Sequence, residues 1–237
     1  MTQTKHCVRG QQRRFAEQAR AQELHDILRN LEGLYAAVVA DVLDKLGYPD
    51  QVVHPCIRPI YPEARLVGRA FTVAATPSTE RRIPPYEIEF AALDSLGPHD
   101  IFVYASKGGV GATWGELFSA RARLRGCLGC LTDGMVRDTA RMIRMRFPVF
   151  CAGFCPADTY GRVQAIAYGV PVICGGVTVR PGDIVLGDYD GVVIVPSDVV
   201  SEVIRLAHDK ASTESKVRAA LMRGESVKSV YAKYGVM

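Results

Sequence analysis

Long apolar runs are missing from this sequence, and so is a strong excess of either charge. No stretch approaches the roughly 18–20 consecutive apolar residues of a membrane helix, so we expect no transmembrane segment and no membrane partner. The opening stretch MTQTKHCVRGQQRR is polar and basic, without the apolar core of a secretory signal. A net charge of +4 is too small to indicate nucleic acid as a partner.

The cysteines and histidines give no clear metal or triad pattern. An odd number of cysteines, 7 in 237 residues, favours free thiols in a reducing, cytoplasmic setting. Cys127, Cys130, Cys151 and Cys155 have spacings that resemble a zinc site. The first two fall in an apolar strand pattern, whose alternation would point them to opposite faces, so we expect small buried hydrophobes. The 5 histidines are scattered and support neither a zinc hydrolase nor a Ser-His-Asp enzyme.

Helix and strand patterns alternate through the middle of the chain, which predicts one α/β domain with helical ends. Helices are expected over residues 11–30, 34–46, 87–96, 137–146 and 226–234, and in the tail that begins at the N-cap Ser197. Strands are expected over residues 66–75, 101–105, 149–153 and 170–174, and in a hairpin within RPGDIVLGDYDGVVIVP. Residues 159–167 are ambiguous, and residues 51–62 read as a loop.

The stretch from Gly108 to Asp138, GGVGATWGELFSARARLRGCLGCLTDGMVRD, carries the sharpest chemical signal. Its glycine turn lacks the lysine of a P-loop, but it stands between an apolar run and a helical pattern. Backbone amides near Gly115, Glu116 and Leu117 are therefore expected at a helix N-terminus, where they can hold an anion.

The second apolar run of this stretch ends in the cluster Asp-Gly-Met-Val-Arg-Asp, residues 133–138. Charged groups this close together seldom serve packing alone, because burying them unpaired is costly. Arg137 can bind a carboxylate or an enolate through two hydrogen bonds, and Asp138 can hold a divalent cation. The combination predicts a site for a small 2-oxo acid, with a simple ion pair at the strand end as the alternative.

Gly115-Glu116-Leu117 upstream of Gly129-x-x-x-Asp133-Gly134-x-x-Arg137-Asp138 resembles the signature of the RraA-like family. That family contains class II aldolases that release pyruvate from 4-hydroxy-4-methyl-2-oxoglutarate or 4-carboxy-4-hydroxy-2-oxoadipate, and protein regulators of ribonuclease E. The resemblance covers roughly residues 34–205, so residues 1–33 are expected to form an N-terminal helical extension and residues 206–237 a C-terminal helical tail.

The resemblance implies a swivelling β/β/α fold, like that of the phosphohistidine domain, in a homotrimer or hexamer with sites between subunits. It implies that Arg137 binds the pyruvoyl group and stabilises its enolate, and that Asp138 holds Mg²⁺ or Mn²⁺. Glu116 would orient a metal-bound water, and the amides of Gly115, Glu116 and Leu117 would hold the substrate carboxylate. Oxaloacetate decarboxylation passes through the same enolate and is an expected side activity.

Several acidic and basic residues are weaker candidates. The family also uses acidic groups from a neighbouring subunit, for which Glu202 and Glu214 are candidates here. Arg81 or Arg82 could meet a second substrate carboxylate. Asp41 and Asp44 fit a solvated helix face better than a site.

Two other functions compete with a pyruvate-releasing lyase. One is a related enzyme that acts on another small acid, such as a sugar acid. The other is a non-catalytic ring that binds a protein partner. The presence of Glu116, Arg137 and Asp138 together favours catalysis, since a ring that only binds a partner does not need this set.

Overall fold

The computed structural model describes residues 22–236. Its helices are residues 22–31, α2 (Ala36–Lys45), α3 (Glu87–Ser95), α4 (Glu116–Leu124), α5 (Thr139–Arg144), α6 (Val200–Met222) and α7 (Val227–Tyr234). Its strands are β1 (Arg58–Pro59), β2 (Leu66–Pro77), β3 (Asp100–Ala105), β4 (Ala112–Trp114), β5 (Gly129–Thr132), β6 (Met135–Val136), β7 (Val149–Cys151), β8 (Gly153–Phe154), β9 (Val163–Tyr168), β10 (Val172–Cys174), β11 (Val177–Val179), β12 (Ile184–Asp188) and β13 (Gly191–Val195).

The main sheet has eight strands in the order β1-β7-β5-β3-β2-β12-β13, with β9 paired to β2. Strands β2, β3, β5 and β7 are parallel, whereas β12, β13 and β9 are antiparallel to their neighbours. One segment touches both edges of this sheet, because Val52 bridges Val193 of β13 and Arg58 pairs with Cys151 of β7. The sheet is therefore a nearly closed barrel, in agreement with the predicted α/β class.

Strands β12 and β13 show why the sheet is covered on both sides. Val185 and Ile194 face the barrel interior, where they pack with the β10–β11 hairpin. Their neighbours Ile184 and Val195 point the other way and pack against α2 and the first part of α6. This alternation follows from the period of two in a β-strand. A third apolar cluster lies between the sheet and α3, α4 and α5.

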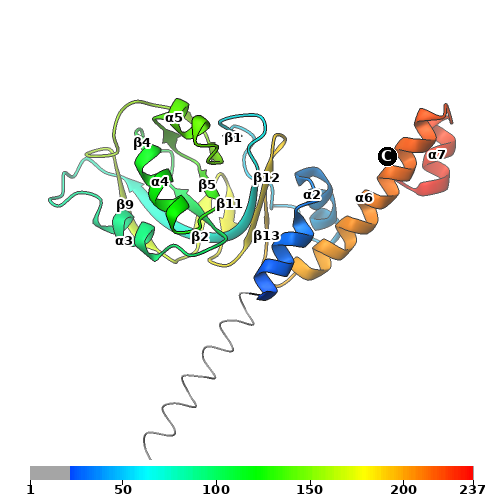
Figure 1. Ribbon diagram of the computed structural model, residues 1–237, viewed down its shortest axis with the longest axis horizontal. Coiled ribbons are helices and arrows are strands. Elements are labelled where there is room, and N and C mark those ends of the chain that lie inside the picture. Colours follow the sequence, from blue (N-terminus) through cyan, green and yellow to red (C-terminus); the bar gives the residue numbers. More distant parts are fainter. Residues whose placement is uncertain (1–21, 237) are drawn as a thin grey trace, which may run out of the picture.

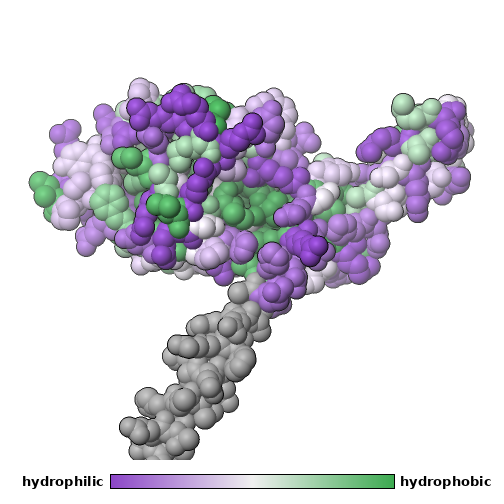
Figure 2. All heavy atoms as spheres, viewed as in Figure 1, coloured by the Kyte–Doolittle hydropathy of each residue, from purple (hydrophilic) through white to green (hydrophobic). Residues whose placement is uncertain are grey.

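Helix α6 packs on the sheet only through its first half, which contributes Val200, Val203, Ile204 and Ala207 to the core. Its second half and α7 project from the body and pack on each other (Figure 1) through Val217, Ala220 and Val230. On the face shown in Figure 2 this projecting end is mostly hydrophilic, and an apolar area lies between α4 and α2. No described helix is long and apolar enough to cross a membrane.

Most expected elements are present, including the hairpin, which is β12–β13, and the final helix, whose Ser226 caps α7. The ambiguous segment 159–167 contains β9. The part of the first expected helix over residues 11–21 lies outside the described residues. Cys127, Cys130 and Cys151 are buried, as expected, whereas Cys155 is only half-buried. Cys127 precedes its strand and packs in the same cluster as Cys130.

Two expected helix starts are wrong. The helix expected from Arg137 begins only at Thr139, because Asp138 has a left-handed backbone with φ of 58° and stands outside the helix as its N-cap. Ser197 does not cap α6, whose N-cap is Val199. The Ser197 amide instead donates to the Asp183 carboxylate at 3.1 Å, which holds this residue in the turn before the helix.

We predict that Gly129→Ala destabilises the fold by about 1–3 kcal/mol, the usual cost of overpacking a core. A Cβ at residue 129 would lie 2.3 Å from Leu66 Cδ2 and 2.7 Å from the Pro148 carbonyl oxygen, and the backbone oxygen cannot move aside cheaply. Urea unfolding measures the change. Gly33→Ala is the matched control, since no atom lies within 4 Å of a Cβ there. Equal stability of the two variants would contradict this account of β5 packing.

Candidate functional site

Three parallel strands of the main sheet each continue into a short strand of a second, three-stranded sheet. Strand β3 leads to β4, β5 to β6 and β7 to β8, and the second sheet has the order β4-β6-β8 with parallel pairing. The segments that follow these short strands therefore meet at one edge. In open α/β folds, ligands bind at the carboxyl ends of parallel strands. The candidate site lies at this edge.

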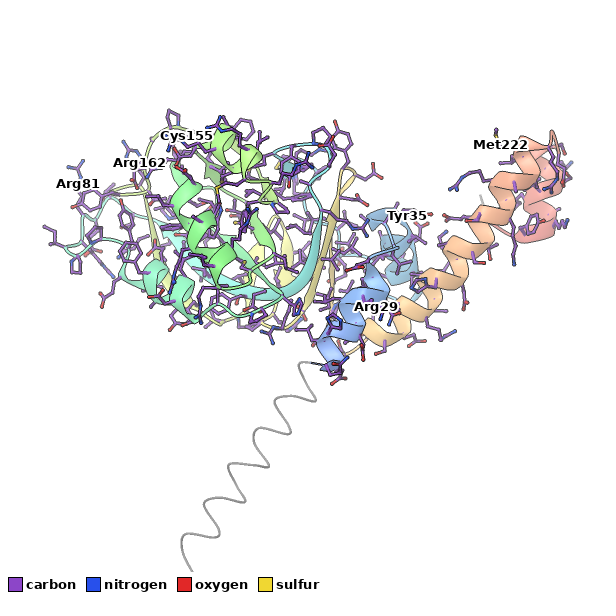
Figure 3. The ribbon with its side chains drawn as sticks, in the orientation of Figure 1. Arg29, Tyr35, Arg81, Cys155, Arg162 and Met222 are labelled. Carbon is purple, nitrogen blue, oxygen red and sulfur yellow. The ribbon has the colours of Figure 1, made fainter. Side chains whose placement is uncertain are left out.

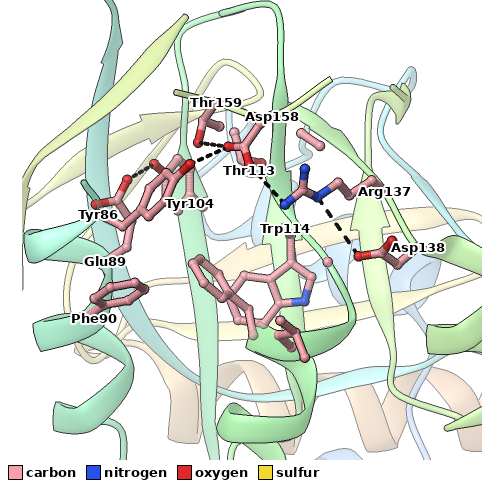
Figure 4. Close-up of a pocket in the computed structure, with 14 residues that line it drawn as sticks. Tyr86, Glu89, Phe90, Tyr104, Thr113, Trp114, Arg137, Asp138, Asp158 and Thr159 are labelled. Carbon is pink, nitrogen blue, oxygen red and sulfur yellow. Dashed lines mark hydrogen bonds and ion pairs between the residues drawn. The ribbon is translucent and has the colours of Figure 1, made fainter. Parts of the chain in front are cut away.

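A cavity of about 220 Å³ opens there. Its charged end is lined by Arg137, Asp138 and Asp158, and its other walls come from α3, β3, β4 and the start of α4 (Figure 4). The structure thus brings together four of the expected site residues, because Gly115, Leu117, Arg137 and Asp138 all line the cavity. Glu116 does not line it.

Arg137 lies between two carboxylates. Its guanidinium is 3.1 Å from Asp158 Oδ2 and 4.0 Å from Asp138 Oδ2 (Figure 4). The side chain lines the cavity and is 40% exposed. The backbone N–H of Arg137 donates to the Trp114 carbonyl and fixes the residue beside β4. The two acidic partners hold the guanidinium in place and leave part of it free for a ligand.

Gly115 brings the start of α4 against Asp138. A Cβ on Gly115 would lie 2.8 Å from Asp138 Oδ2, so a side chain there would displace the carboxylate. Within α4 the first amide to donate to a backbone oxygen of this turn is that of Ser119, which bonds to the Gly115 carbonyl. Of the amides before it, that of Glu116 donates to Asp138 Oδ2 at 3.4 Å, and those of residues 117 and 118 are the donors that a helix N-terminus leaves without a partner inside the helix.

The carboxylate of Glu116 points toward α5 and forms an ion pair with Arg141 at 2.8 Å. Only its backbone amide approaches the expected metal residue, 3.4 Å from Asp138 Oδ2. The structure therefore places Glu116 beside the cavity, on the helix whose start lines it, with its side chain engaged elsewhere.

Asp158 is the residue at the charged end that the sequence pattern did not single out. Its Oδ1 accepts hydrogen bonds from the Tyr86 hydroxyl at 2.8 Å and from the Tyr160 amide at 3.1 Å. Burial alone would raise the pKa of Asp158, but these hydrogen bonds and the charge of Arg137 outweigh it, and the pKa is lowered. Burial and the bond to Asp158 raise the pKa of Tyr86 to about 12.

The other acidic member of the Asp-Gly-Met-Val-Arg-Asp cluster has a structural task. Asp133 Oδ1 accepts hydrogen bonds from the amide and the hydroxyl of Ser106, at 2.6 and 2.9 Å. It thereby ties the end of β5 to the loop that leads from β3 to β4. Contrary to the expected arrangement, that loop does not lead directly into α4, because β4 lies between the loop and the helix.

The weaker candidates lie outside the cavity. Arg81 is at the outer end of the β2–α3 loop (Figure 3), and Arg82 pairs with Glu80. Glu214 is bound within its own chain, to Tyr35 and to Lys210, which also pairs with Asp41. Glu202 is an exposed residue in the first turn of α6.

A hard divalent cation fits the donors at Asp138. Mg²⁺ keeps several waters and needs only one or two carboxylates together with substrate oxygens. Asp138 supplies such a carboxylate, since its side chain is 42% exposed and the one amide it accepts from is as far as 3.4 Å. Among residues 22–236 no group of three or more His, Cys, Asp or Glu side chains could enclose a metal, so a caged ion such as structural zinc does not fit.

We predict that Tyr86→Phe raises the pKa of Asp158, because it removes the hydroxyl that donates to the carboxylate. A ¹³C carboxyl NMR titration measures this. The stability contributed by the lowered pKa is complete above the unfolded-state value of about 3.9 and is lost as the pH falls through the folded-state pKa. The wild-type advantage should therefore vanish in acid. Tyr189→Phe, at a 58% exposed position, is the control, and an unshifted Asp158 in Tyr86→Phe would refute the assignment.

Two curated proteins are similar to most of this chain. "Protein DlpA" of Legionella pneumophila is 26% identical over 210 residues, which are 88% of this chain and 34% of that protein. A protein of Halalkalibacterium halodurans named "Putative 4-hydroxy-4-methyl-2-oxoglutarate aldolase" is 29% identical over 82% of this chain and 88% of its own length. The chain thus spans about a third of DlpA but most of the second relative.

Among solved structures, Streptomyces coelicolor RraAS2, described as an unusual member of the RNase ES inhibitor RraA protein family, superposes with a TM-score of 0.74. It is 27% identical, and the match covers 81% of this chain and 96% of that one. The family model RraA-like, described as Aldolase/RraA, matches residues 36–194, which include every residue of the charged end of the cavity. The chain belongs to the RraA-like family.

Proposed function

We propose that this protein is a divalent-metal-dependent lyase that releases pyruvate from a 4-hydroxy-2-oxo acid. The observation that carries the proposal is the position of Arg137, held between Asp138 and Asp158 beside the start of α4. A guanidinium, a helix N-terminus and a partly free carboxylate are the groups that a 2-oxo acid and its enolate require. The name of the Halalkalibacterium relative supports the same reaction class.

The substrate carboxylate is assigned to the amides at the start of α4, and the 2-oxo group to Arg137. Asp138 would hold Mg²⁺ or Mn²⁺, which when bound supplies positive charge next to the developing enolate. Asp158, whose pKa is lowered by its hydrogen bonds and by Arg137, stays ionised and keeps the guanidinium aimed into the cavity.

Cleavage breaks the C3–C4 bond, and its electron pair moves into the enolate of pyruvate. The C4 hydroxyl loses its proton to a water and becomes the carbonyl of the second product, and the enolate carbon then takes up a proton. We assign the positioning of this water to Glu116, which lies between the cavity-lining residues Gly115 and Leu117; its carboxylate, paired with Arg141 in the structure, would have to leave that ion pair and turn toward the cavity. Oxaloacetate decarboxylation would use the same enolate stabilisation, which makes it a convenient assay.

Two finer features remain part of the proposal. One is a homotrimer or hexamer in which a neighbouring subunit completes the site. Glu202 is a candidate for the acidic residue that the neighbour contributes, because it is exposed and forms no ion pair within the described residues. The other is the division into an N-terminal extension, a central domain and a C-terminal tail. A ring that only binds a protein partner has less support, since such a surface does not need a lined cavity with a charged end.

We predict that Arg137→Ala lowers kcat/KM for pyruvate release by about 10²–10³-fold, the scale of losing a group that stabilises an oxyanion. Pyruvate from oxaloacetate and from 4-hydroxy-4-methyl-2-oxoglutarate is measured with a coupled dehydrogenase. Arg144→Ala makes the same change of charge on exposed α5 and should leave the rate unchanged. Equal rates for Arg137→Ala and the control would exclude Arg137 from the chemistry.

We also predict that Asp138→Asn weakens Mn²⁺ binding at least tenfold, because the amide removes the negative charge that attracts the cation. Mn²⁺ binding is followed by electron paramagnetic resonance of the free ion, and activity with EDTA is measured beside it. Asp94→Asn, which changes an exposed carboxylate paired with Arg121, serves as the control. Undiminished Mn²⁺ affinity in Asp138→Asn would place the metal elsewhere.

A further inference from the structure

The end of the cavity away from Arg137 is built from aromatic side chains. Phe90 comes from α3, Tyr104 from β3, Trp114 from β4 and Phe118 from α4, and Tyr86, the N-cap of α3, stands at the border with the charged end, where it bonds to Asp158. We call these five residues the aromatic chamber (Figure 4). Their rings contact one another in sequence: Trp114 meets Phe118 edge to face at 5.6 Å, and Phe118 meets Phe90 at 6.4 Å. Such a surface favours apolar or aryl groups.

One carboxylate lies in this chamber. Glu89 lines the cavity from α3, is only 5% exposed, and accepts a hydrogen bond from the Tyr104 hydroxyl at 3.1 Å. Among the described residues it takes part in none of the ion pairs found. The carboxylate of Glu89 therefore has the Tyr104 hydroxyl as a hydrogen-bond partner and no cationic side chain of the described residues within ion-pair distance. Repulsion between like charges is strong where burial excludes water.

The cavity lining as a whole has more carboxylates than cationic side chains. Arg137 is the cation, and Glu89, Asp138 and Asp158 are the carboxylates, so one positive charge faces three negative ones. A divalent cation at Asp138 would balance this excess, and the carboxylate of a 2-oxo acid then has both the cation and Arg137 as partners. A second carboxylate at the far end of the substrate would meet Glu89, since neither Arg81 nor Arg82 lines the cavity.

We propose that the site prefers a 2-oxo acid whose distal group is uncharged and apolar or aromatic, and that Glu89 weakens the binding of substrates with a second carboxylate without abolishing it. The proposal rests on the 2-oxo acid site of the proposed function and narrows it. The preferred substrate of this chain would then differ from the one in the name of the Halalkalibacterium relative, because 4-hydroxy-4-methyl-2-oxoglutarate has a carboxylate at its distal end.

The test compares the binding of two unreactive ligands that differ in the distal group alone. These are 2-oxoglutarate and 5-methyl-2-oxohexanoate, in which an isopropyl group replaces the distal carboxylate. Calorimetry with Mg²⁺ present gives both affinities. Trp114, the 1 tryptophan of the chain, lies in the chamber wall, so quenching of its fluorescence reports binding in the cavity. Because this test measures binding and not turnover, its result does not depend on catalysis. If the protein cleaves no 4-hydroxy-2-oxo acid, the proposed function is wrong, but the binding preference can still be measured.

We expect wild-type protein to bind 5-methyl-2-oxohexanoate at least about tenfold more tightly than 2-oxoglutarate, a difference of about 1.4 kcal/mol. Glu89→Gln keeps an oxygen that accepts from Tyr104 and removes the charge, so the ratio should fall to about threefold or less. Glu87→Gln, on the same helix but exposed, should keep the wild-type ratio, and thermal unfolding checks that both variants fold. Equal or tighter binding of 2-oxoglutarate by wild type, an unchanged ratio in folded Glu89→Gln, or no binding of either ligand would overturn the proposal.

Discussion

The parallel pairing of β4, β6 and β8 is the constraint on which the site depends. Each of these strands has only two or three residues and adds little stability alone. Because each continues a buried strand of the main sheet, the order β3-β5-β7 is repeated as β4-β6-β8. The residues after them, at the start of α4, at Arg137 and Asp138, and in the loop of Asp158, are consequently brought to one place from three segments spread over residues 115–158. No single segment could supply this combination.

Local signals in the sequence were sufficient for the parts of the site that lie within one segment. The spacing of Gly115 and the Asp-Gly-Met-Val-Arg-Asp cluster predicted a helix start beside Arg137 and Asp138. Gly115, Leu117, Arg137 and Asp138 line the cavity, whereas Glu116 does not and its carboxylate pairs with Arg141. Asp158, Tyr86 and Glu89 escaped prediction because their proximity depends on pairing between strands and on the docking of α3 over the sheet. The only local hint concerned Asp158, which together with Thr159 forms a polar pair a few residues after an apolar strand.

The boundaries of elements were harder to predict where tertiary contacts compete with propensity. The basic segment from Arg137 has the composition of a helix, but the backbone of Asp138 turns left-handed before the helix begins. An aspartate tolerates that conformation at modest cost, and such positions gather at functional sites. The main sheet was easier, because its apolar strands alternate with helices and each strand face is buried by a separate cluster.

The segment from Val52 to Arg58 also bears on how the protein behaves in concentrated solution. Exposed edges of a sheet offer unpaired N–H and C=O groups to other chains and are common starting points for aggregation. Here the same short segment contacts β13 at one edge and β7 at the other. The outer edges of β13 and β7 are thereby paired with the protein's own backbone, which removes these two strands as templates for a foreign strand and leaves β9, which among the described strands pairs only with β2, as the strand of this sheet to watch.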